Sequence, residues 1–218
     1  MNLVVKITPN EKGNPPGKLA DAELHFIDGE LDGLKLIGFG VWERRSGDGR
    51  NVTFPARQYA VNGERRSFAL LRPIAGLLRP IGGRSAEERI RELVIQTYAE
   101  HEQGCDFVTP ATGQATSVVV KITPNEKGNP PGKLADAELH FIDGELDGLR
   151  LIGFAIWERR SGDGRNVTFP ARQYAVNGER RSFALLRPIA DQSAQNRLRD
   201  LVLQAYAEQV QETAEPAR

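Results

Sequence analysis

The stretch KLADAELHF fills positions 18–26, and the same letters return without a change at positions 133–141. It belongs to a longer duplication, in which residues 4–75 match residues 119–190 at a constant offset of 115. Only three positions differ between these segments. A solenoid repeat has a period of about 20–50 residues, so this much longer period predicts two copies of one small domain.

The match resumes between residues 90–103 and 198–211 at an offset of 108. The offset changes because Leu70–Gly76 is followed by a near copy, Leu77–Gly83, that only the first half carries. The segment between the copies is rich in Gly, Thr, Ala and Pro, a composition with little preference for regular structure. The domain boundaries predicted from these features are repeat 1 at 1–103, a linker at 104–117, repeat 2 at 118–211 and a tail at 212–218.

Alternating apolar and polar residues predict the strands of each copy. In Lys18–Phe26 the residues Ala20, Ala22, Leu24 and Phe26 alternate with Leu19, Asp21, Glu23 and His25, which indicates a strand with one face toward solvent. In the next segment, 34–43, the same period places Ile37, Phe39 and Val41 on one face, with Leu36 and Trp42 on the other. Pro55 is expected at a strand edge or end. Asn62-Gly63 is a strong signal for a two-residue hairpin.

A helix is predicted at the end of each copy. Ser85 and Glu88 have the spacing of a capping box, and Ser193 is the corresponding cap in the second copy. Apolar residues follow at helical spacing. These stripes are Ile90, Leu93, Val94 and Tyr98 in repeat 1, and Leu198, Leu201, Val202 and Tyr206 in repeat 2. Strands followed by a helix favour an α+β fold, here two copies of an antiparallel β-sheet with a C-terminal helix.

Composition limits the class of protein. Lys plus Arg is 29 and Asp plus Glu is 29, so a large global excess of positive charge is absent. The single cysteine, Cys105, excludes an intrachain disulfide framework and a multi-cysteine metal site. No apolar run reaches the roughly 18 residues of a membrane span, and residues 1–6 lack the layout of a signal peptide. We therefore expect a cytoplasmic protein with no membrane partner.

Motifs for catalysis are missing from the sequence. It contains no P-loop, G-x-S-x-G or H-E-x-x-H pattern. His25 and its copy His140 are interpreted as surface residues, and His101 falls at a helix end. The prediction is therefore a non-enzymatic protein with no catalytic residues, no metal and no cofactor. An enzyme built from scattered carboxylates is the least favoured alternative.

Charge is unevenly placed inside each copy. Residues 11–32 hold six acids and two lysines, a net charge of −4, whereas residues 34–73 hold eight bases and three acids, a net charge of +5. Seven of the eight bases are arginine, which pairs with phosphate through its planar fork and stacks on bases. The aromatic residues interleaved with them are Trp42, Phe54, Tyr59 and Phe68. This composition is typical of a single-strand binding surface. Alternatively, the arginines are solvated turn residues or pair with the acidic segment.

The order of these features resembles a known family. Lys18–Leu24 leads into the sheet, Leu31–Val41 follows, and Gly49-x-x-Val52-x-Phe54-Pro55-Ala56-Arg57 comes next. The Asn62-Gly63 hairpin, Arg72-Pro73-Ile74 and the helix complete the copy. This order is similar to that of the SpoVG (stage V sporulation protein G) family of small bacterial regulators. The resemblance implies an antiparallel sheet with a helix, dimerisation, and binding of DNA and in some members of RNA.

The chain departs from that family in three respects. Family members carry one copy and dimerise, whereas this chain carries two. The segment Trp42–Arg45 has no counterpart, and Leu77–Gly83 interrupts the junction between sheet and helix. Because fusion makes association intramolecular, we expect the two copies to pack as a pseudo-dimer, with a higher homo-oligomer as a further expectation.

The leading hypothesis is a SpoVG-like regulator that binds DNA or RNA through arginine-rich sheet and hairpin surfaces. The resemblance places the family's basic stretch on Arg57, Arg65 and Arg66, and on Arg172, Arg180 and Arg181. The predicted contacts also include Arg44, Arg45, Arg159 and Arg160, with Trp42, Tyr59, Trp157 and Tyr174 as candidates for base stacking. The alternative is an interaction or self-assembly scaffold with no nucleic-acid ligand, in which identical copies exchange elements.

Overall fold

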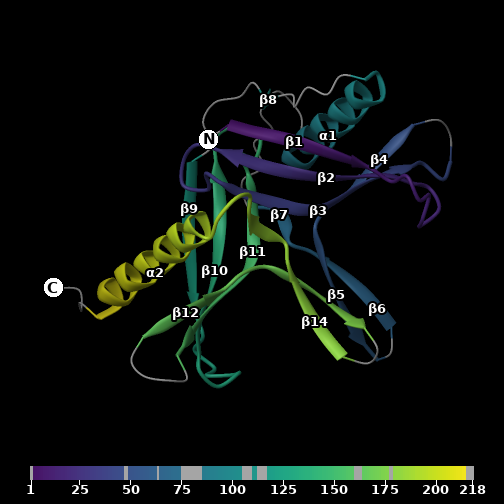
Figure 1. The fold of residues 1–218 in the computed structure, drawn as a ribbon. Coiled ribbons are helices and arrows are strands. Elements are labelled where there is room, and N and C mark those ends of the chain that lie inside the picture. The colour runs from purple at the N-terminus through teal and green to yellow at the C-terminus, as the bar shows by residue number, and fades with distance from the viewer. Residues whose placement is uncertain are drawn as a thin grey trace.

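The structure is a computed structural model that describes residues 2–46, 49–62, 64–74, 85–104, 110–111, 117–159, 164–176 and 179–214. It is rich in antiparallel sheet and contains two helices, one at the end of each copy (Figure 1). The first copy comprises β1 (Asn2–Pro9), β2 (Lys18–Ile27), β3 (Leu34–Glu43), β4 (Arg50–Thr53), β5 (Ala56–Val61), β6 (Glu64–Ala69), β7 (Leu71–Pro73) and α1 (Ala86–Glu102). The second comprises β9 (Ser117–Pro124), β10 (Lys133–Ile142), β11 (Leu149–Glu158), β12 (Arg165–Thr168), β13 (Ala171–Val176), β14 (Glu179–Ala184), β15 (Leu186–Pro188) and α2 (Ser193–Ala214).

Two large sheets exchange their short last strands. In each copy the first four strands pair in sequence order, β1 to β4 and β9 to β12. The strand β7 then pairs with β11 of the other copy, where Leu71 lies opposite Leu151. The strand β15 pairs with β3, where Leu186 lies opposite Leu36. Each large sheet therefore contains strands from both copies.

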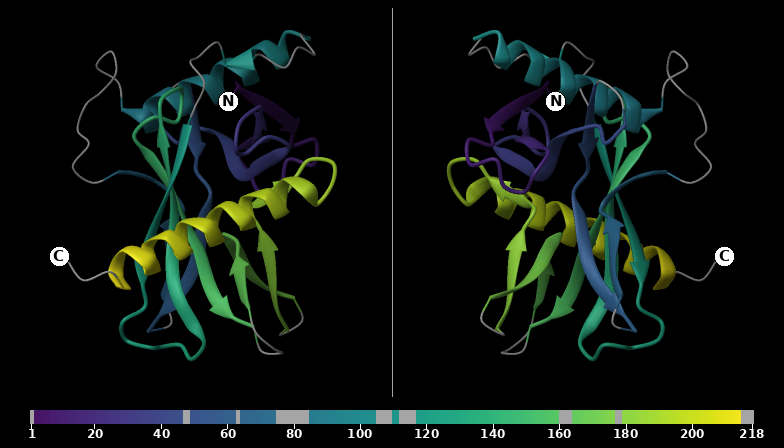
Figure 2. Two further views of the ribbon diagram at one scale, coloured as in Figure 1. Left: turned by 90° about the vertical axis from the view of Figure 1, so that its left-hand side faces the viewer. Right: turned by 90° about the vertical axis from the view of Figure 1, so that its right-hand side faces the viewer.

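The buried face of each sheet follows the predicted alternation in β2. Ala20, Ala22, Leu24 and Phe26 are fully buried or nearly so, as are the corresponding residues of β10. Helix α1 covers the first sheet and α2 covers the second (Figure 2). Apolar residues of both copies form one continuous cluster, so the two copies share a core.

The predicted alternation of β3 is wrong at its centre. The register shifts between Ala22 and Glu23 of β2, and Gly38 stands at this irregularity with a φ of +105°. Leu36 therefore shares the buried face with Phe39, although a strict period of two assigned them to opposite faces. A side chain at position 38 would be strained at this φ and would lie 3.2 Å from the Leu185 side chain, which explains glycine there.

The helix starts agree with the prediction in one copy and differ in the other. The Ser85 hydroxyl accepts a hydrogen bond from the Glu88 N–H, and the Glu88 carboxylate accepts one from the Ser85 N–H, which completes the predicted capping box. Ser193, however, is the first residue of α2 rather than its cap. Its N–H donates to Asp191 at 2.7 Å, and the first copy has no acid at the corresponding position, Gly83.

Reciprocal contacts join the copies around the exchanged strands. Phe26 stacks on its own counterpart Phe141, with ring centroids 6.5 Å apart and planes inclined by 10°. Arg89 of α1 donates to the Asp147 carbonyl at 2.7 Å, and Arg197 of α2 donates to the Asp32 carbonyl at 2.6 Å. The same contact is thus made twice, once from each copy to the other.

The linker contributes a short strand, although its composition predicted little regular structure. Residues Pro110–Ala111 form β8, which pairs with β1 at Leu3 and Val4. The corresponding outer edge of β9 has no partner strand within the described ranges, and Val119 there is 49% exposed. Cys105, the linker residues around β8 and the segment 77–83 lie outside the described residues.

Candidate nucleic-acid interface

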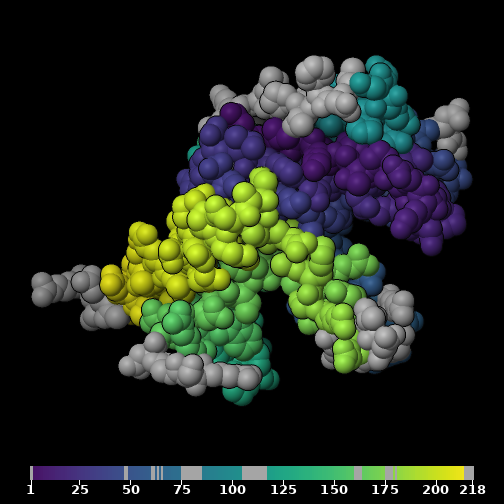
Figure 3. Space-filling view, viewed as in Figure 1, coloured from purple at the N-terminus to yellow at the C-terminus, as the bar shows by residue number. Residues whose placement is uncertain are grey.

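Two hairpins, β5–β6 and β13–β14, stand out from the sheets with β5 lying against β13 (Figures 1 and 3). Residues directly opposite each other in an antiparallel pair share one face. The register places Arg57 opposite Phe68 and Tyr59 opposite Arg66. The same face of β13–β14 carries Arg172, Phe183, Tyr174 and Arg181. We call these two sets of four residues the hairpin surfaces.

The side chains of the hairpin surfaces are exposed. Tyr59 and Tyr174 are each 43% exposed, and Phe68 is 38% exposed. Arg57 and Arg172 are exposed and form no hydrogen bond or ion pair with other described residues. Arg66 contacts Glu64 at 3.3 Å, and both side chains are largely in solvent, so this pair holds the guanidinium weakly. Among the described residues, none of these arginines contacts an acid of residues 11–32 or of the corresponding residues 126–147. The alternative that they pair with the acidic segment is therefore not supported.

Each hairpin surface continues onto the sheet of the opposite copy through one further arginine. The guanidinium of Arg187 lies 4.8 Å from the Phe183 ring centroid, and Arg187 is opposite Lys35 in the β15–β3 pair. Arg72 makes the same contact with Phe68 at 4.7 Å and lies opposite Arg150. Each hairpin surface thus gains one cation from its own copy, on the short strand that pairs with the sheet of the other copy.

A polar cluster occupies the outer face of the first sheet. His25 Nε2 lies 2.9 Å from Glu23 Oε2, and Lys35 Nζ donates to the same oxygen at 2.9 Å. Partial burial raises the pKa of Glu23, but the hydrogen bonds from His25 and Lys35 outweigh it and hold the pKa below its ordinary value. Glu138, His140 and Arg150 repeat the cluster in the second sheet, again with a lowered Glu138 pKa. His25 thus lies on the polar face of β2, but the interpretation of a plain surface residue is wrong, because its side chain is only 14% exposed and contacts Glu23.

Replacing Glu23 with glutamine is expected to lower stability by about 1 kcal/mol or less at pH 7. Because the pKa of Glu23 is lower in the folded protein, its contribution is present above the unfolded pKa and is lost as the pH falls through the folded pKa. The difference from wild type in urea unfolding should therefore shrink in acid. Glu30→Gln is the control, because Glu30 is exposed and has no ion pair among the described residues. A difference that stays constant with pH would contradict this account.

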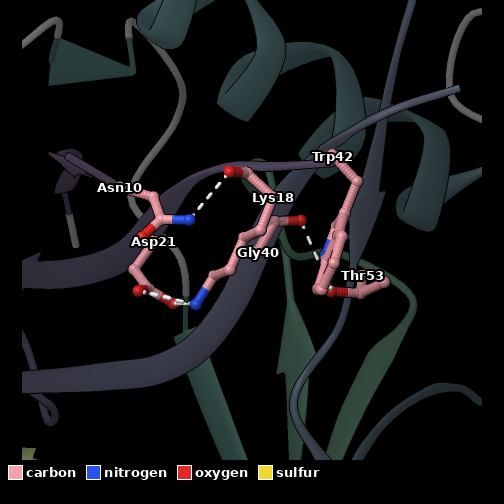
Figure 4. A network of polar contacts seen from close by, with 6 residues as sticks. All are labelled: Asn10, Lys18, Asp21, Gly40, Trp42 and Thr53. Atoms are coloured by element: carbon pink, nitrogen blue, oxygen red, sulfur yellow. Dashed lines mark hydrogen bonds and ion pairs between the residues drawn. The ribbon is translucent and has the colours of Figure 1, made fainter. Parts of the chain in front are cut away.

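The predicted stacking residue Trp42 lies at the β3–β4 end of the sheet rather than on a hairpin surface. It is half-buried, and its indole N–H donates to the Thr53 hydroxyl at 3.0 Å (Figure 4). Trp157 makes the same bond to Thr168 at 3.2 Å. Nearby in Figure 4, Lys18 forms an ion pair with Asp21. The indole N–H group fastens β4 to β3, so the exposed Tyr59 and Tyr174 are the better stacking candidates.

The remaining predicted arginines are divided between two places. Arg44 and Arg45 are exposed after β3, and Arg159 follows β11 in the same way. The Arg44 guanidinium donates to the Arg50 carbonyl at 3.2 Å, so this side chain lies at the start of β4 and not on a hairpin. The structure does not describe Arg160, nor the side chains of Arg65 and Arg180. It therefore brings Arg57 and Arg66 together, and Arg172 and Arg181 together, but not with Arg44 or Arg45.

The site residues predicted from the sequence do not include Arg72 and Arg187. Their contacts with Phe68 and Phe183 depend on how β7 and β15 leave the hairpins. Arg72 lies four residues after Phe68 in the same copy, but the residues lie on two different strands, and the sequence does not indicate how these strands are oriented to each other. The sequence also contains no pattern that predicts the pairing of β7 with β11.

Comparison with known proteins does not assign a family. No family model, no curated protein and no solved structure matches this chain. Within the described residues, no group of three or more His, Cys, Asp and Glu could hold a metal ion. Among the described helices, neither is long and apolar enough to cross a membrane.

Proposed function

We propose that this protein is a non-enzymatic, SpoVG-like regulator of the bacterial cytoplasm that binds nucleic acid through its two hairpin surfaces. The observation that carries the proposal is the exposed alternation of arginine and aromatic side chains on one face of each hairpin. Guanidinium groups pair with phosphates, and exposed aromatic rings stack on bases. A single strand is the favoured ligand, because its bases are available for stacking.

The proposal includes a pseudo-dimer in which both copies contribute to one binding surface. Reciprocal strand exchange, the Phe26–Phe141 stack and the contact of β5 with β13 support it. Two joined hairpins engage one ligand with a high effective concentration for the second contact. Fusion of the copies therefore favours longer strands over short ones.

Fluorescence anisotropy with labelled single-stranded DNA, duplex DNA and RNA tests the proposal. Binding is expected to be tighter at about 50 mM salt than at about 200 mM, because phosphate contacts release counterions. The preferred probe should be a single strand, and affinity should rise when the strand is long enough to reach both hairpins. Absence of binding to all three probes at low salt would reject the proposed function.

A second candidate function, self-assembly, is supported by the edge of β9. Val119 is 49% exposed there, and Val118 and Val120 are half-buried, whereas β8 covers part of the corresponding edge of β1. An uncovered apolar edge is able to pair with a strand of another molecule. In this candidate, two chains associate through their β9 edges.

Under self-assembly, molar mass should rise with concentration, and Val119→Lys should abolish the rise because edge lysines oppose strand pairing. Light scattering coupled to size-exclusion chromatography measures the molar mass at each concentration. Val4→Lys is the matched control, since Val4 occupies the same place on the edge where β8 pairs. A mass that does not depend on concentration would reject this candidate and leave the nucleic-acid proposal unaffected.

A further inference from the structure

A pocket of about 650 Å³ lies in the second copy, between α2 and the ends of three strands. Leu134 of β10, Leu203 and Tyr206 of α2 form an apolar wall. Arg159 and Arg165, which flank the β11–β12 turn, bring two guanidinium groups, and Glu158 brings one carboxylate. A volume of this size is within the range of small-molecule sites, which combine apolar walls with a few polar groups.

The corresponding place in the first copy contains one further carboxylate, that of Glu102. Arg50, the counterpart of Arg165, forms an ion pair with Glu102. Burial and a hydrogen bond to Glu102 raise the pKa of the Tyr98 hydroxyl, so this carboxylate contacts both groups. At the offset of 108, Glu102 corresponds to Val210, which is 40% exposed. The substitution removes the negative charge that neutralises this arginine in the first copy.

Arg165 keeps its place without that partner. Its guanidinium lies 4.7 Å from the Tyr206 ring centroid, as that of Arg50 lies 4.6 Å from Tyr98. Unlike Arg50, Arg165 is exposed, and it forms no ion pair within the described part of the chain. The aromatic ring thus holds the arginine side chain in the pocket while its hydrogen-bond donors stay available.

Arg159 also lines the pocket, and its backbone N–H donates to the Gly164 carbonyl at 3.0 Å. A Cβ atom at position 164 would lie 3.3 Å from Arg159 Cδ, and the residue has a φ of +140°. Glycine therefore gives the arginine stem room to lie along the turn. The pocket presents two cations against the single Glu158 carboxylate, which leaves it with a net positive charge.

We propose that this pocket of the second copy binds an organic phosphate, a phosphomonoester joined to an apolar or aromatic group. The Arg159 and Arg165 guanidinium groups donate to the phosphate oxygens, since planar forks match this anion. Leu134, Leu203 and the edge of Tyr206 contact the attached group. The ligand is either a free nucleotide or the 5′-phosphorylated end of a strand, which share this chemistry. The site does not rest on nucleic-acid binding by the hairpins.

Calorimetric titration of the whole chain with adenosine 5′-monophosphate tests the site. One equivalent is expected to bind with a dissociation constant of about 0.1–1 mM at low salt, and adenosine without phosphate is expected not to bind. Val210→Glu restores the carboxylate of the first copy and should weaken binding at least about tenfold. Val210→Gln is the matched control, because it adds similar bulk without charge and should retain binding.

A substitution in the first copy tests the same proposal through the number of nucleotides bound. Glu102→Val should release Arg50 and raise the stoichiometry from one equivalent to two, because the first copy then resembles the second. A 5′-phosphorylated oligonucleotide that binds more tightly than its unphosphorylated form would identify a strand end as the ligand source. The proposal is overturned if neither the nucleotide nor the phosphorylated strand binds, or if Val210→Glu leaves the affinity unchanged. Substitutions on the hairpin surfaces should not alter the nucleotide titration, so the two proposals fail separately.

Discussion

Replacing Phe26 with alanine is expected to lower the free energy of unfolding by about 3–5 kcal/mol. Phe26 is fully buried and stacks on Phe141 at the contact between the two copies. Its removal leaves a cavity in the shared core, and the rigid strands β2 and β10 limit how far the surroundings can fill it. An effect of this size approaches the whole stability of many domains.

Urea unfolding followed by tryptophan fluorescence measures the loss. Ile27→Ala is the control, because Ile27 is the next residue of β2 and is 39% exposed, so its replacement should cost well under half as much. Phe26→Ala and Phe141→Ala together should cost less than the sum of the single changes, since both remove the same stack. Equal losses for Phe26→Ala and Ile27→Ala would contradict a core shared across this contact.

The buried face of a single strand could be predicted from the sequence. In β2 every second residue from Ala20 to Phe26 is buried, which confirms the predicted alternation. The faces of β3 could not be predicted, since the bulge at Gly38 shifts the phase at the point where the Ile37 N–H donates to the Leu185 carbonyl of the other copy. Local patterns carry information about one strand, and this bulge lies at a contact with a residue far away in the sequence.

The strand exchange could not be predicted for a different reason. The strand β7 pairs with residues 149–151, whose counterparts in the first copy are residues 34–36. These two partners differ only at Lys35 and Arg150, so the sequence offers β7 two nearly equivalent strands. The path of the chain after the hairpin decides between them.

Near-identical sequences also acquire different surroundings in the two copies. The edge of β1 receives β8, whereas the edge of β9 stays uncovered in the described ranges. Arg50 is paired with Glu102, whereas Arg165 faces a pocket beside Val210. The first difference arises in the linker, and the second arises at the end of α1, in a segment where the two copies match less closely. New binding properties of one copy should therefore be sought at its borders, and shared properties on the hairpins.

Replacing all four arginines of the hairpin surfaces with glutamine is expected to weaken single-strand binding at least about 100-fold at low salt. The four residues are Arg57, Arg66, Arg172 and Arg181. Each phosphate contact on a single strand contributes about 0.7 to the slope of log affinity against log salt, so the slope should fall by about 3. Anisotropy titrations at several salt concentrations measure both quantities. Because these side chains are exposed, the fold should survive, and circular dichroism checks it.

A matched variant tests whether a loss of affinity comes from the hairpin surfaces or only from the change in net charge. Lys6, Lys12, Lys121 and Lys127 are exposed and lie outside the hairpins, so replacing them with glutamine removes the same charge. Long-range attraction falls equally in both variants, but only the hairpin variant loses phosphate contacts. Tyr59→Ala with Tyr174→Ala should weaken binding by about 1–3 kcal/mol per stacked base and leave the salt slope unchanged. If the lysine variant lost as much affinity as the arginine variant, the hairpin surfaces would not be the binding site, because charge alone would explain the loss.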